Sequence, residues 1–295
     1  MPTVPSQPPF ARVSFWHEPF GIRVRCVLDL PCLSKSGQTT GVAIEATGAM
    51  QHWFGLGPFS KNMIREVAQS LGVLLSKLDK SDGTTFLYWG TNDPGLIQPL
   101  GFRTAEQWLS FPFAAPRYYG HENRLLPAIQ YFTDGIHPGT GRRFREESTS
   151  QGIFVFLLDG DIEDFEEVRG YCLKLAGESE SGCYPIRLIS VGFGSQFLAN
   201  SKGQMQALAA QLRRIKTPIF SSVVADELHA VPEVAREAIM ANVMVAEMGV
   251  VFDANGEEIR RFPAGLPGMF EFYLSANSTA FAVNIDGTVH TQTLS

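Results

Sequence analysis

The sequence is poor in the features that mark several classes of protein. Its 24 Lys and Arg residues are outnumbered by 30 Asp and Glu residues, so the formal net charge is -6. A nucleic-acid-binding protein needs a basic face that contacts phosphates, and this balance of charge argues against a nucleic acid as partner. No uninterrupted apolar run reaches the roughly 20 residues of a membrane-spanning helix, so we expect no membrane association.

Cysteine is scarce, and the N-terminal residues carry no targeting pattern. The first residues lack a basic segment followed by an apolar stretch, so we expect no secretory signal and a cytoplasmic location. The cysteines never form the closely spaced pairs of a zinc site. We therefore expect all of them to be buried as small apolar residues: Cys26, Cys32, Cys172 and Cys183.

From residue 40 onward, short β-branched or aromatic runs alternate with amphipathic segments. This alternation is typical of a parallel sheet covered by helices, and it predicts an α/β fold with a Rossmann-like doubly wound, mainly parallel sheet. The expected strands are residues 41–45, 84–89, 152–158, 186–193 and 218–224. The expected helices are residues 60–78, 123–133, 161–176, 202–215 and 232–247, the first with Ser60 as its cap.

Both ends of the chain break the alternation and predict an accessory β element. Residues 23–30 alternate like an edge strand, and further strands are expected at 250–252, 258–262, 270–274 and 280–285. Chain ends often meet, so the N-terminal strand pairs either with these strands or with its neighbours in sequence. The expected domains are an N-terminal extension with an edge strand (1–35), the α/β domain (38–224), and a C-terminal helix and β extension packed on it (225–295).

Two carboxylates follow buried strands of the expected sheet. Glu45 ends the run 41–45, and Asp159 comes directly after 152–158. In open α/β sheets, ligands collect in the crevice beyond the carboxyl ends of parallel strands. The sequence therefore predicts that Glu45 and Asp159 meet at one rim of the sheet and mark a binding site.

The order of motifs along the chain resembles a von Willebrand factor A (vWA) domain, which carries a metal-ion-dependent adhesion site. The family's first strand ends in Asp-x-Ser-x-Ser, and here that place is taken by Glu45-Ala46-Thr47-Gly48-Ala49-Met50. Asp159-Gly160 matches the aspartate and glycine that end the family's central strand, and residues 191–194 resemble its next strand end. A vWA fold over residues 38–224 is what this resemblance implies.

Two further segments extend the resemblance. Aligning residues 120–128 with the family's threonine segment places Asn123 at the threonine, whereas a shorter register chooses Glu122. The C-terminal tail resembles bacterial vWA proteins associated with tellurium-resistance and general stress clusters. Residues 1–35 show no such resemblance.

The resemblance implies a divalent cation, Mg²⁺ or another, bound by Glu45, Thr47, Asn123 and Asp159. The match is degenerate, because Glu45 is longer by about 1.5 Å than the family's aspartate and Ala49 offers no ligand. Two rim carboxylates repel unless a metal, a proton or hydrogen bonds stabilise them. The alternative is a site without metal in which Glu45 or Asp159 caps a neighbouring backbone loop.

Aromatic residues gather in two segments that flank the expected rim. Trp53 and Phe54 follow the first motif, while Tyr118 and Tyr119 precede Asn123. Aromatic side chains are enriched at protein interfaces, so these four residues are predicted to contact a partner. The competing interpretation is that they pack against one another or against the accessory strands.

No catalytic residues are expected. There is no Gly-x-Ser-x-Gly motif, and Asp159 with Asp161 resembles the aspartate pair of haloacid-dehalogenase phosphatases but lacks the hydroxyl residue that follows it. The expected function is therefore a non-enzymatic module that binds another protein, in a bacterial stress or metal-resistance complex. The alternatives are a metal-independent scaffold that binds through the accessory β element, and a phosphohydrolase that uses Asp159.

Overall fold

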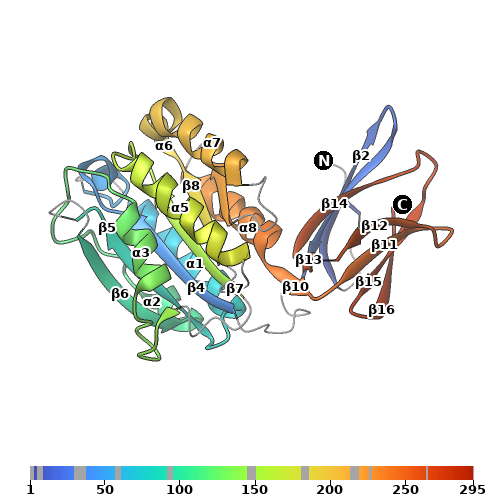
Figure 1. Ribbon diagram of the computed structural model, residues 1–295, viewed down its shortest axis with the longest axis horizontal. Coiled ribbons are helices and arrows are strands. Elements are labelled where there is room, and N and C mark those ends of the chain that lie inside the picture. The colour runs from blue at the N-terminus through green and yellow to red at the C-terminus, as the bar shows by residue number, and fades with distance from the viewer. Residues whose placement is uncertain are drawn as a thin grey trace. The chain divides into compact units, whose positions relative to one another are not determined.

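The computed structural model describes residues 3–4, 9–29, 38–56, 61–91, 96–144, 151–180, 186–212, 219–225, 228–263 and 265–294. The chain forms two compact units. Lys35–Ala238 make the larger one, and Met1–Ser34 with Ile239–Ser295 make the smaller one. Each unit has its own sheets (Figure 1).

A six-stranded sheet forms the centre of the larger unit, with the strand order β6-β5-β4-β7-β8-β9. The strands are β4 (Gln38–Glu45), β5 (Gly83–Trp89), β6 (Ile97–Thr104), β7 (Gln151–Leu158), β8 (Ile186–Gly192) and β9 (Phe220–Val224). All neighbours pair in parallel except β5 and β6. The chain builds the sheet outward from β4 in one direction and from β7 in the other, so the predicted doubly wound, mainly parallel sheet is confirmed.

The predicted helices correspond to α1 (Met63–Leu78), α3 (Leu126–Asp134), α5 (Phe165–Glu180), α7 (Lys202–Leu212) and α8 (Val231–Asn242). The sequence did not predict the short helices η2 (Gly48–His52), α2 (Ala105–Ser110), α6 (Gly194–Gln196), η3 (Phe197–Ser201) and η4 (Leu228–Ala230). Asn62 caps α1 by accepting from the Arg65 backbone N–H. The predicted cap, Ser60, lies outside the described residues, as do residues 213–215 of the expected helix 202–215.

Several helix boundaries differ from those predicted from the sequence. Helix α3 begins three residues later than expected, so Asn123 lies in the loop before it. Helix α5 begins at Phe165 because residues 161–164 form the turn that follows the rim. The last expected helix, 232–247, ends at Asn242, and Met244–Ala246 form strand β10.

Both faces of the central sheet are buried, which explains why its strands read as continuous apolar runs. Alternate side chains of β4 and β7 face opposite helices. Ala43, Phe154 and Phe156 belong to one core cluster with side chains of α3, α5 and α7. Helix α1 turns Ile64, Val67, Leu71 and Leu75 inward. Among the described residues, every helix is too short or too polar to traverse a lipid bilayer.

The smaller unit is the accessory β element. Its strands are β1 (Thr3–Val4), β2 (Phe10–Glu18), β3 (Gly21–Leu28), β10 (Met244–Ala246), β11 (Gly249–Asp253), β12 (Glu258–Phe262), β13 (Leu266–Pro267), β14 (Met269–Leu274), β15 (Ala280–Ile285) and β16 (Thr288–Thr293). Strand β3 pairs antiparallel with β14, which confirms an accessory element built from both chain ends. Phe272 and Phe281 pack edge to face at 5.0 Å between the two four-stranded sheets.

The cysteines of the described residues are buried as expected. Cys26 lies in β3 and Cys172 in α5, and both are free thiols. Burial raises the pKa of Cys172 to about 12. Cys32 and Cys183 lie outside the described residues.

Gly41 is the tightest point of the central sheet. A Cβ at this position would lie 2.3 Å from Cε1 of Phe132, whose ring stacks on Phe154 at 4.8 Å. The glycine therefore leaves room for an aromatic ring to pack directly against β4.

We expect Gly41→Ala to lower the free energy of unfolding by about 1–3 kcal/mol, because the added methyl overpacks a core that cannot expand. The measurement is urea denaturation. Gly170→Ala in α5 is the matched control, since a Cβ there meets nothing within 4 Å. It should leave stability unchanged or raise it by about 0.5–1 kcal/mol, and equal destabilisation of both variants would contradict the packing of Phe132 on β4.

Candidate functional site

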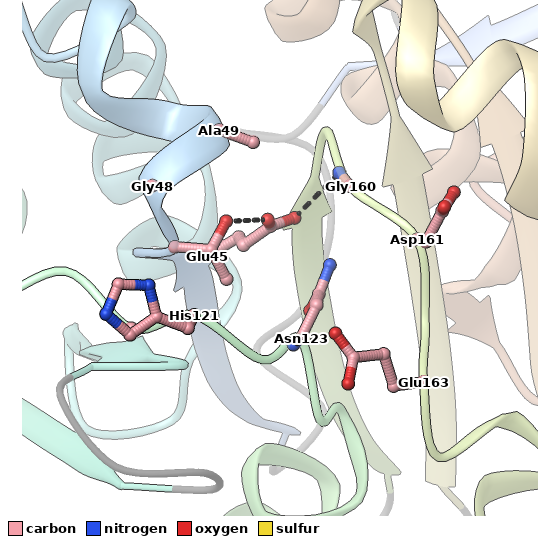
Figure 2. A pocket seen from close by; sticks show the side chains of 10 residues that line it. Glu45, Gly48, Ala49, His121, Asn123, Gly160, Asp161 and Glu163 are labelled. Carbon is pink, nitrogen blue, oxygen red and sulfur yellow. Dashed lines mark hydrogen bonds between the residues drawn. The ribbon is translucent and has the colours of Figure 1, made fainter.

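Glu45 connects strands β4 and β7, the pair of neighbours from which the sheet is built outward in opposite directions. It is the last residue of β4, and Asp159 and Gly160 follow directly after the neighbouring β7. The Oε2 atom of Glu45 accepts hydrogen bonds from the backbone N–H groups of Asp159, at 2.9 Å, and Gly160, at 3.1 Å. Glu45 and Asp159 therefore lie at one rim of the sheet, where open α/β folds bind ligands. Figure 2 shows Glu45 next to Gly160 at this rim.

The second oxygen of the Glu45 carboxylate is also occupied. Oε1 accepts from the Thr47 hydroxyl at 2.5 Å, and the side chain is completely buried. Burial raises the pKa of Glu45, and the hydrogen bonds from Thr47, Asp159 and Gly160 act in the opposite direction. The nearby charge of Asp159 adds to the increase.

Backbone hydrogen bonds bring a third segment to the rim. Gly120 donates to the carbonyl oxygens of Gly90, at 2.9 Å, and Ala46, at 3.2 Å, and it accepts from the Gly48 N–H at 3.0 Å. Thr47 and Gly120 thereby form a short parallel bridge. The loop that leads to Asn123 is held beside the end of β4 by these bonds.

The backbone of Asn123 is fixed by the turn after β7. Its N–H donates to Oε1 of Glu163 at 3.4 Å, and its carbonyl accepts from the Glu163 N–H at 3.0 Å. Asp164 accepts from the N–H groups of Leu125 and Leu126, each at 2.9 Å, and so caps α3. Asn123 therefore cannot shift without breaking its own hydrogen bonds to Glu163 or those of the next two residues to Asp164.

The Asn123 side chain is buried, yet its polar atoms are unsatisfied. The residue is 5% exposed, and neither Oδ1 nor Nδ2 finds a hydrogen-bond partner in the described part of the chain. Figure 2 shows the amide pointing toward the Glu45 carboxylate. Of the two sequence alignments considered, Asn123 and not Glu122 reaches the pocket at the rim.

This pocket has a volume of about 330 Å³ and an acidic lining. The residues that line it are Glu45, Thr47, Gly48, Ala49, Gly120, His121, Asn123, Gly160, Asp161 and Glu163. Three of them are carboxylates and none is lysine or arginine. Sequence reasoning used Asp161 only in the phosphatase alternative and gave Glu163 no role in a site, although their positions two and four residues after Asp159 were a usable signal.

Asp159 turns away from this pocket. Its Oδ2 accepts from the indole N–H of Trp53 at 2.6 Å, and a Cβ on Gly194 would lie 1.6 Å from its Oδ1. Burial raises the pKa of Asp159, while the Trp53 hydrogen bond and the charge of His52 lower it. The two rim carboxylates thus share an edge of the sheet but have separate surroundings.

The predicted partner-binding aromatics divide between interior and surface. Trp53 is half-buried and packs edge to face on Phe193 at 5.9 Å. Phe54 is buried between Tyr88 and Tyr119, so its ring faces the protein interior. Tyr118 is 53% exposed and is available to a partner.

The donor set does not fit the octahedral magnesium site that the vWA resemblance implies. Ala49 has no oxygen, Asp159 is bonded to Trp53, and both oxygens of Glu45 already accept hydrogen bonds. Of the ligands that the resemblance implies, only Thr47 and Asn123 have side-chain oxygens that accept no hydrogen bond in the described structure. Over the described ranges, no group of three or more His, Cys, Asp or Glu side chains is placed to hold a metal ion. Metal ligation by the four predicted residues stays a prediction.

Comparison with known proteins gives only distant structural similarity. No protein-family model and no curated protein matches the sequence. Proximal thread matrix protein 1 from the mussel byssus matches 72% of this chain and 49% of its own, with 11% identity and a TM-score of 0.48. The same protein with a zinc-occupied MIDAS motif gives 10% identity, 72% and 48% coverage, and a TM-score of 0.46.

The structure of a second protein has a similar TM-score. The pilus adhesin SpaC from Lactobacillus rhamnosus GG matches 95% of this chain and 43% of its own, with 8% identity and a TM-score of 0.45. This chain thus spans less than half the length of each solved chain. Scores at this level carry no functional argument. The structure has a doubly wound α/β unit with an acidic pocket at the switch point of its sheet.

We expect Glu45→Gln to change how stability depends on pH. Because the folded-state pKa of Glu45 is raised above its ordinary value of 4.5, ionisation costs the folded state more than the unfolded chain. The contribution of Glu45 to the stability of the folded state is therefore complete below its ordinary pKa of 4.5. It falls as pH rises through the folded-state pKa.

The stability of the variant relative to wild type, measured by urea denaturation, should accordingly increase as pH rises from the ordinary pKa of Glu45 through its raised folded-state pKa. Glu106→Gln, at an exposed residue of α2, controls for the loss of a carboxylate. Curves for wild type and Glu45→Gln that stay parallel over this range would show that Glu45 is not held in the buried position described.

Proposed function

We propose that this protein is a non-enzymatic interaction module that binds another protein through the pocket at the rim of its central sheet. The observation that carries the proposal is the buried Asn123 amide, whose two polar atoms lack partners among the described residues, in a residue that lines the pocket of about 330 Å³. Buried polar groups are nearly always hydrogen-bonded, so free ones at a switch point favour a missing ligand. Exposed Tyr118, two residues before Gly120 of the lining, adds a contact of the type enriched at interfaces.

The vWA resemblance supports the same class of function. It favours an adhesion-type module, and the C-terminal tail favours a bacterial stress or metal-resistance complex as its setting. Both rest on sequence motifs, and the site geometry supports the binding proposal independently of them.

A scaffold role for the accessory β element is the second candidate. Phe20, Tyr273 and Val289 of this unit are large, apolar and exposed. Exposed aromatic and aliphatic side chains are common in protein contacts, although single ones also occur on ordinary surfaces. Phosphohydrolysis by Asp159 has less support, since its carboxylate is bonded to Trp53 and lies against Gly194.

Quantitative affinity capture from a lysate of the source cells separates the first two candidates. Asn123→Leu removes both free polar atoms at similar volume, and Tyr273→Ala with Val289→Ala removes exposed accessory side chains. We expect proteins captured by wild type to be reduced at least about tenfold with Asn123→Leu and retained with the accessory variants. The reverse pattern would establish the scaffold, and full retention by every variant would contradict the rim proposal.

A divalent cation at the rim is tested separately by calorimetric titration of metal-stripped protein with magnesium, manganese and calcium. Because Ala49 offers no ligand and the Asp159 carboxylate is bonded to Trp53, we expect no saturable binding at physiological Mg²⁺ concentration. Stoichiometric binding that Thr47→Val abolishes would instead establish the metal-dependent form of the site.

A further inference from the structure

The Asn123 side chain combines burial, fixed position and two unused hydrogen-bonding atoms. Leaving a buried donor or acceptor unpaired costs about 1–3 kcal/mol, so each free atom on Asn123 is a cost that a bound group would remove. Trp89 and Tyr119 also have unpaired buried polar atoms in the described structure, but neither residue lines the pocket. Of these three residues, only Asn123 lines the pocket.

The surroundings hold the Asn123 amide ready for such a contact. Glu163 and the α3 cap fix its backbone, as described above, and Gly160 keeps the space beside it clear. A Cβ on Gly160 would lie 2.8 Å from both Asn123 Nδ2 and Glu45 Oε1. Any residue larger than glycine at this position would therefore occupy the space in front of the amide.

The chemistry of the free atoms restricts what can bind. Oδ1 of Asn123 accepts and Nδ2 donates, and the two atoms lie side by side on one planar group. A metal ion, an ammonium or a guanidinium group satisfies Oδ1 only, because none of them has an acceptor for Nδ2. A carboxylate satisfies Nδ2 only and would enter beside Glu45, Asp161 and Glu163, whose charges repel it.

A carboxamide meets both requirements. Its carbonyl oxygen accepts one hydrogen bond and its NH₂ group donates two, while the group itself is uncharged. One N–H pairs with Asn123 Oδ1 and the carbonyl pairs with Nδ2. The second N–H is available to the acidic lining, where carboxylates are strong acceptors.

We propose that the rim pocket recognises a carboxamide through paired hydrogen bonds with Asn123. This inference rests on the proposed function, because a site that binds another protein would take the carboxamide from an Asn or Gln side chain of that partner. The same chemistry occurs in a free small amide, and the experiment below distinguishes the two.

The test is a titration of uniformly ¹⁵N-labelled full-length protein, followed by the amide signals of Gly120, Asn123 and Gly160. Acetamide is the probe, and sodium acetate and methylammonium chloride are its charged counterparts of similar size. We expect saturable shifts with acetamide in the millimolar range, as a ligand of few atoms allows, and at least tenfold weaker responses to both ions. Equal or stronger binding of either ion, or no saturable shift with acetamide, would overturn the proposal.

Asn123→Asp is the decisive variant, because it keeps the shape of the side chain and replaces only the donor. It should lower acetamide affinity at least tenfold. It should also raise affinity for Mg²⁺, since a carboxylate is a better ligand than an amide. Unchanged acetamide binding in Asn123→Asp would overturn the proposal. Unchanged strand signals in the spectrum of each variant establish that it is folded.

Competition separates this inference from the proposed function. Release of captured protein by excess acetamide would show that the carboxamide belongs to a partner protein. Acetamide binding without any captured protein that depends on Asn123 would support a free small amide and contradict the interaction module. Capture that depends on Asn123 but is insensitive to acetamide would keep the module and overturn the carboxamide.

Discussion

The site depends on one buried carboxylate that joins two strands. Glu45 at the end of β4 accepts from Asp159 N, Gly160 N and the Thr47 hydroxyl. These bonds offset part of the cost of burying the charged group. Burial has the larger effect, so the pKa of Glu45 is still raised. They also fix the turn after β7, and that turn holds Asn123 through Glu163 and caps α3 through Asp164. Without Glu45, the turn after β7 would lose its hydrogen bonds to the end of β4.

This arrangement gives each of the two acidic residues at the rim its own stabilising contacts. Glu45 is stabilised by backbone donors, and Asp159 by the indole of Trp53. The remaining opening is therefore lined by a neutral amide and a hydroxyl, with Asp161 and Glu163 around them. A vWA adhesion site places a cation at this edge of the sheet. Here the same edge offers donor and acceptor atoms to an uncharged polar group.

Apolar runs and their order predicted the sheet, its winding and the meeting of Glu45 and Asp159, because these follow from strand direction alone. Strand β6 was missed since Pro99 and Gly101 disfavour strands, yet an edge position tolerates both. Strand β10 continues the apolar pattern of α8 and gave no signal of its own. The sequence did not predict the direction of the Asp159 carboxylate or the unpaired Asn123 amide. Both depend on side-chain packing around Gly194 and Gly160, which sequence spacing does not encode.

The most direct test of this account is detection of the Glu45 hydrogen bonds themselves. In ¹³C,¹⁵N-labelled protein, scalar coupling across a hydrogen bond reports the pairing of a specific nitrogen with a specific carboxyl carbon. The account predicts couplings from the backbone nitrogens of Asp159 and Gly160 to the side-chain carboxyl carbon of Glu45, and their loss in Glu45→Ala. Wild-type protein in which both amides exchange rapidly with solvent and show no such coupling would contradict it.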